Sequence, residues 1–128
     1  MELKEFKNKI DNRELWGNNE KENWNLANKW CEERNDNLEE AVKWSFDCGF
    51  KLDFDGALLF VSSRFYPPHK SHEDYGKWHG NITFILLGEE IHKKEVESNT
   101  LDEIANSTEK YVKDKIEELK PKIKELFN

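Results

Sequence analysis

The sequence predicts an α+β fold: a four-stranded antiparallel meander with a long C-terminal helix and two to three short N-terminal helices. Three observations predict it. Apolar residues have helical spacing before residue 49, apolar and polar residues alternate between turn signals after it, and a capping box begins the last segment. A chain of 128 residues without a linker or an internal repeat is one domain by size. We divide 1–128 into a helical part (1–48), a sheet (49–99) and a C-terminal helix (100–128).

The N-terminal part is expected to be helical, because its apolar residues recur every three or four positions. The first helix is marked by Leu3, Phe6 and Ile10. The second is marked by Trp24, Ala27, Trp30 and Cys31. A third is predicted over 38–46, from Leu38, Ala41, Val42, Ser45 and Phe46.

Four strands are expected between 49 and 99. Phe50, Leu52 and Phe54 alternate with charged residues, which indicates a half-buried strand, and Asp55-Gly56 after them is a hairpin signal. Apolar segments predict the next two strands at 57–66 and 81–87, followed by a tight turn at Gly88-Glu89. The charged segment 90–97 suits an edge strand. Connections this short favour an antiparallel order.

The last helix begins with a capping box, in which Thr100 can accept a hydrogen bond from the amide of Glu103. An apolar stripe continues to Leu119, and Pro121 is expected to kink the helix or to begin a short second one. We expect the long helix to cover one face of the sheet, and the N-terminal helices to cover the other face or an end.

Charge narrows the classes of partner. The formal net charge is −7, with only three arginines, so no broad basic face for nucleic acid is expected. A basic protein effector suits this charge, and the densest acidic segment is the expected contact: Glu32, Glu33, Asp36, Glu39 and Glu40. The alternative is that these carboxylates serve only solubility and helix capping.

The loop between the two most apolar strands holds three of the four histidines: His69, His72 and His79. Imidazole is a ligand for zinc and other transition metals, so the three are weak candidates for a metal site. Their spacing matches no established metal motif, and solvent exposure is the simpler explanation. We therefore expect no cofactor.

Aromatic residues near the same loop suggest a ligand site. Arginine pairs with phosphate or carboxylate, and aromatic rings stack on bases. The predicted ligand-binding residues are Arg64, Tyr66, Tyr75, Trp78 and His79, and an anionic small molecule such as a nucleotide is the expected ligand. In the alternative, Phe65 and Tyr66 belong to the core and Arg64 pairs with Asp53 or Asp55 across the hairpin.

The expected compartment is the cytoplasm. Cys31 and Cys48 form no disulfide framework, the N-terminal residues do not resemble a signal peptide, and no segment is apolar enough to span a membrane.

These observations predict a non-catalytic cytosolic binding or inhibitor protein, of the kind that includes toxin-immunity and phage anti-defence proteins. It would occupy a basic effector or sequester a nucleotide signal. The alternative is a small histidine- or metal-dependent enzyme that uses the loop 66–80. A third possibility is a structural subunit, because the apolar end at Leu126 and Phe127 can support a homodimer.

Overall fold

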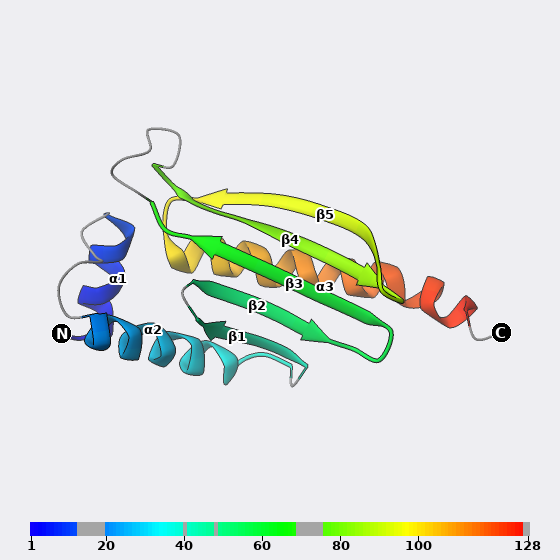
Figure 1. Cartoon of the computed structure of the whole chain (residues 1–128), viewed down its shortest axis with the longest axis horizontal. Coiled ribbons are helices and arrows are strands. Elements are labelled where there is room, and N and C mark those ends of the chain that lie inside the picture. The colour runs from blue at the N-terminus through cyan, green and yellow to red at the C-terminus, as the bar shows by residue number, and fades with distance from the viewer. Residues whose placement is uncertain (13–19, 40, 48, 69–75, 127–128) are drawn as a thin grey trace.

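The computed structural model describes residues 1–12, 20–39, 41–47, 49–68 and 76–126. Within these residues one sheet and three helices are present (Figure 1). The helices are α1 (Leu3–Asp11), α2 (Glu20–Asn35) and α3 (Leu101–Glu125). The strands are β1 (Val42–Phe46), β2 (Phe50–Asp55), β3 (Leu59–Tyr66), β4 (Trp78–Leu86) and β5 (Glu89–Ser98).

The sheet is an antiparallel meander in the order β1-β2-β3-β4-β5. Each strand pairs with its neighbours in the chain, as the short connections predict. The α+β class, the antiparallel sheet and the long C-terminal helix are confirmed, but the sheet described has five strands, where the sequence predicted four.

The additional strand replaces the helix predicted over 38–46. In β1, Trp44 and Phe46 are buried and Val42 is half-buried, while Lys43 and Ser45 between them are exposed. This two-residue period is that of a strand, and Val, Trp and Phe favour strands. A short apolar segment fits the helical and the strand periods equally well, which is why spacing alone gave the wrong element.

The turn between β4 and β5 is formed by Leu87 and Gly88, one residue before the predicted position. Both residues have positive φ, 51° and 84°, as a two-residue hairpin turn of type I′ requires. Thr100 caps α3 as predicted, because its side chain accepts a hydrogen bond from the Glu103 amide at 3.1 Å. Pro121 lies inside α3 and begins no separate helix in the described residues.

All three helices pack on one side of the sheet. In Figure 1, α3 crosses behind the strands, α2 runs along β1, and α1 lies at one end. The Trp30 ring on α2 packs edge-on against Trp44 and Phe50, at centroid distances of 5.0 and 5.2 Å. Of the two predicted positions for the N-terminal helices, α1 occupies the end, whereas α2 lies along β1 on the same side of the sheet as α3 and therefore at neither position.

The core lies between the sheet and these helices, and aromatic rings dominate it. The largest fully buried side chains include Trp44, Trp78, Phe6, Phe50, Phe65 and Phe84. Among the described residues no element covers the opposite face of the sheet (Figure 1). That open face is therefore where strand side chains meet solvent.

Candidate functional site

The open face is built from alternate residues of the strands. On β3 these are Phe60, Ser62, Arg64 and Tyr66, whereas Leu59, Val61, Ser63 and Phe65 are buried. The strand register aligns them with residues of β2 and β4 in cross-strand rows. One row contains Lys51, Arg64 and Asn81, and the next contains Tyr66 and His79.

Lys51 and Arg64 are direct partners across β2 and β3, which places two cations side by side. Directly opposed like charges destabilise a sheet. Among the described residues Arg64 forms no ion pair, and Lys51 forms a long one with Asp47, whose Oδ2 atom lies 3.9 Å from the Lys51 Nζ atom. The predicted pairing of Arg64 with Asp53 or Asp55 is therefore not observed as an ion pair among the described residues.

Asp53 pairs with Ser62, two residue pairs further along the same two strands and on the same face. Burial raises the pKa of its carboxyl, while the charges of Lys51 and Arg64 and a backbone hydrogen bond from Ser63 oppose the rise. The two cations thus act electrostatically on Asp53 from nearby. A half-buried carboxyl therefore lies near the two cations on the same face of the sheet.

Tyr66 and His79 form an aromatic platform beside the two cations. Their rings are stacked, with centroids 5.5 Å apart and planes inclined by 29°. Tyr66 is 41% exposed, so one side of the pair meets solvent. Because Tyr66 is two residues from Arg64 on the same strand face, the platform lies about 6.6 Å along β3 from the arginine.

The other predicted ligand residues are not brought to this face. Trp78 is fully buried on the opposite side of the sheet, where its indole Nε1 donates to the Asp11 Oδ1 atom at 2.6 Å. Tyr75 lies outside the described residues. Arg64, Tyr66 and His79 thus remain from the predicted set, and the structure adds Lys51 and Asn81.

The predicted metal ligands His69 and His72 also lie outside the described residues. His79 is half-buried on the open face, and its Nδ1 atom lies 3.5 Å from the Lys77 carbonyl oxygen. In the part of the chain that the structure describes, no group of three or more His, Cys, Asp or Glu side chains is arranged to hold a metal ion.

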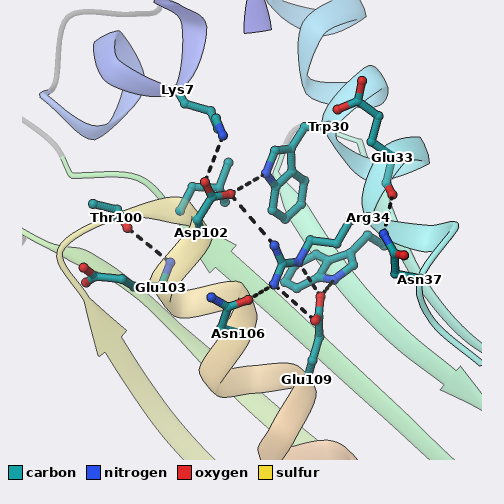
Figure 2. Close-up of polar contacts among 12 residues, drawn as sticks. Lys7, Trp30, Glu33, Arg34, Asn37, Thr100, Asp102, Glu103, Asn106 and Glu109 are labelled. Atoms are coloured by element: carbon teal, nitrogen blue, oxygen red, sulfur yellow. Dashed lines mark hydrogen bonds and ion pairs between the residues drawn. The ribbon is translucent and has the colours of Figure 1, made fainter. Parts of the chain in front are cut away.

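The acidic segment is exposed. Glu32, Glu33, Asp36 and Glu39 all face solvent, and Glu40 lies outside the described residues. The one cation of this segment turns away from them. Arg34 donates to the Glu109 carboxylate and to the Asn106 side chain, both on α3 (Figure 2). Arg34 therefore does not act as a counter-ion for the carboxylates of its own segment.

A polar cluster among the described residues joins the helices, as Figure 2 shows. The Asp102 carboxylate accepts from the Lys7 Nζ atom at 2.9 Å and from the Trp30 indole at 3.0 Å. The Glu109 carboxylate accepts from the Trp44 indole at 2.7 Å as well as from Arg34. These bonds connect α1, α2, α3 and β1, so we assign the cluster to stability.

Two carboxyls near this cluster have pKa values shifted in opposite directions. Burial opposes the ionisation of Asp102, but hydrogen bonds from Trp30 and Lys7, and the charges of Lys7 and Arg34, outweigh it and lower its pKa. Burial raises the pKa of Asp11, although the Leu101 amide and the Trp78 indole donate to it. Burial also raises the pKa of the Cys31 thiol to about 12, which keeps it protonated and unreactive.

No protein-family model, curated protein or solved structure matches this chain. None of the described helices is both long and apolar enough to cross a membrane. We therefore infer the function from the geometry of the site.

Proposed function

We propose that this chain is a non-catalytic cytoplasmic binding protein whose open sheet face holds an anionic, ring-bearing small molecule such as a nucleotide. The observation that carries the proposal is the Lys51–Arg64 pair, two neighbouring cations on a bare face, beside the stacked Tyr66–His79 rings. A bound anion would offset the repulsion that this pairing costs the free protein.

The residue types suit the two parts of such a ligand. Arg64 can grip a phosphate with two parallel hydrogen bonds, and Lys51 adds a point charge beside it. The exposed side of the Tyr66–His79 stack offers a flat surface for a base, since base–aromatic stacking tolerates any base. The distance of about 6.6 Å between arginine and ring positions is of the size that a sugar bridges.

Isothermal titration tests this directly. We would titrate the protein with nucleoside mono-, di- and triphosphates, with pyrophosphate, and with an uncharged nucleoside. Nucleotides should bind, and Arg64→Ala or Lys51→Ala should weaken binding by at least about tenfold, as expected for the loss of a charged hydrogen bond. Tyr66→Ala should weaken nucleotide binding but leave pyrophosphate binding nearly unchanged.

Lys43→Ala is the matched control, because Lys43 is an exposed lysine of β1, adjacent to Asp53 and outside the row of Lys51 and Arg64. It should bind like the wild type. The proposal fails if no heat appears for any anion near about 1 mM. It fails equally if Arg64→Ala and Lys51→Ala bind as tightly as the wild type.

A second candidate is inhibition of a basic effector protein, as toxin-immunity and phage anti-defence proteins do. The inward turn of Arg34, which binds Glu109 and leaves the exposed carboxylates of the acidic segment without this cation, favours it. Charge would act mainly on association rate and specificity.

A partner captured from native cytosol would be purified and tested again. Binding should weaken with salt and with Glu33→Lys plus Glu39→Lys, but not with Glu125→Lys at the far end of α3. Binding unchanged by both salt and the double reversal would exclude this candidate.

The alternative of a histidine- or metal-dependent enzyme stays a prediction, since two of its three histidines lie outside the described residues. Bound metal in protein purified without a histidine tag, together with turnover lost in His79→Ala, would favour the enzyme over the binding protein.

A further inference from the structure

A groove of about 650 Å³ lies between α3 and the segment that leads from α2 into β1, away from the open sheet face. Its apolar lining combines Leu38, Val42 and Phe54 on one side with Val112 and Ile116 of α3 on the other. Val112 is buried, but the other four are only partly buried. The groove therefore leaves apolar area in contact with water.

The two walls of this groove carry opposite charge. On the α3 wall, Lys110 and Lys113 are exposed, and neither forms an ion pair with a described residue. The Glu109 and Glu117 carboxylates of that wall already accept from Arg34 and Lys120. The opposite wall carries the exposed Glu39, whose charge also acts on Lys120 of the α3 wall. Asp36, three residues before Glu39 in the turn after α2, is exposed too, although it does not line the groove.

We propose that the occupant of this groove is a second copy of the chain, related by a two-fold axis that runs along the groove. Rotation about such an axis places the acidic wall of each copy against the basic wall of the other, so each contact occurs twice. It also brings the apolar linings of the two copies together. A groove with oppositely charged walls is thus complementary to itself.

The position of the C-terminal end of α3 supports the same axis. In Figure 1 this end extends past the strands, and Leu126 on it is 53% exposed. A two-fold axis along the groove makes the two α3 helices parallel, so both projecting ends lie at the same end of the dimer. There the two Leu126 side chains can cover each other, which an antiparallel arrangement does not allow.

Sedimentation and light scattering over a concentration series test the proposal with two charge-reversed variants. The first carries Lys110→Glu and Lys113→Glu, and the second carries Asp36→Lys and Glu39→Lys. All four positions are exposed, so both variants should fold, which circular dichroism checks. The wild type should dimerise, and each variant alone should be monomeric because its two walls then have like charge.

The decisive result is the mixture of the two variants. At a 1:1 ratio every reversed wall meets a wall of opposite sign, so a mixed dimer should form at concentrations where neither variant dimerises alone. Lys93→Glu on the open sheet face is the control and should dimerise like the wild type. A wild type that stays monomeric throughout, a dimer that persists in both variants, or a mixture that stays monomeric would each overturn the proposal.

Discussion

The side chain of Asn35 at the end of α2 binds both backbone groups of Trp44 in β1. Its Oδ1 atom accepts from the Trp44 N–H at 2.7 Å, and its Nδ2 atom donates to the Trp44 carbonyl at 2.9 Å. The amide thus takes the place that a neighbouring strand would occupy. Because an open edge strand invites pairing with other chains, this contact protects the β1 edge of the sheet. At the other edge, β5 is protected by its charged residues, as predicted.

Replacing Asn35 should open that edge. Asn35→Ala leaves a backbone donor and an acceptor without partners, so we expect a loss of about 1–3 kcal/mol in the free energy of unfolding and more aggregation. Urea unfolding and light scattering measure the two effects. Asn37→Ala is the control, because the exposed side chain of Asn37 makes one long hydrogen bond among the described residues, to the Glu33 carbonyl at 3.5 Å, and its loss should change stability by less than about 0.5 kcal/mol. Equal effects of the two variants would contradict this role.

Gly80 should tolerate no larger residue. A Cβ atom there would lie 2.4 Å from both the Arg64 carbonyl oxygen and the Phe65 ring. Gly80→Ala should therefore cost about 1–3 kcal/mol of stability and weaken ligand binding by displacing Arg64. Gly49→Ala is the matched control, since its Cβ would meet the Phe65 carbonyl at an ordinary 3.7 Å. A Gly80→Ala protein as stable as Gly49→Ala would show that the strands adjust freely.

The Arg34–Glu109 pair should show coupling. Arg34→Met leaves the half-buried Glu109 carboxylate with only the Trp44 indole as a donor. We therefore expect the free energy of unfolding to fall by about 2–4 kcal/mol. The double change Arg34→Met and Glu109→Met should cost less than the sum of the single changes, because no unpaired charge remains. Urea unfolding of the four proteins measures the coupling, and strict additivity would contradict it.

The ionisation of Asp102 and the ionisation of Asp11 should change the free energy of unfolding with pH in opposite directions. The folded pKa of Asp102 is lowered, so its contribution is present above the unfolded pKa of about 3.9 and is lost as the pH falls through the folded value. Asp102→Asn should be less stable than the wild type at pH 7, and the difference should close in acid. The folded pKa of Asp11 is raised, so the wild type gains stability from this group as the pH falls through that value.

Asp11→Asn keeps an oxygen that can accept from Trp78 and Leu101. It should therefore be at least as stable as the wild type at pH 7 and should lose that advantage in acid. Urea unfolding between pH 7 and pH 3 follows both variants. Parallel pH profiles for Asp102→Asn and Asp11→Asn would contradict the two assigned directions.

The elements that the sequence predicted correctly are those whose local signal agrees with their tertiary environment. Phe50 and Leu52 alternate with polar residues and become the buried face of β2, and Thr100 caps α3. The spacing of apolar residues in 38–46 fits both a helix and a strand. The packing of Trp44 against Trp30 and its hydrogen bond with Asn35 select the strand. That contact joins residues from separate elements, so local pattern could not reveal it.

Residue type predicts only part of the candidate site, because the rest depends on how separate strands align. Arg64, Tyr66 and His79 were named from residue type, but Lys51 enters through strand register. A tight turn at Asp55-Gly56 would have set another register, whereas in the structure Asp55 pairs with Phe60. Trp78 was misplaced because a loop was expected at that position. It is the first residue of β4, and alternation from there directs its side chain to the core.

The open face as a ligand site is tested most directly by backbone-amide NMR of the full chain during titration with ATP. We expect progressive shifts on β2, β3 and β4, centred on Lys51, Arg64, Tyr66, His79 and Asn81, and their loss in Arg64→Ala. Saturating shifts centred on other residues, or none up to millimolar ATP, would contradict it.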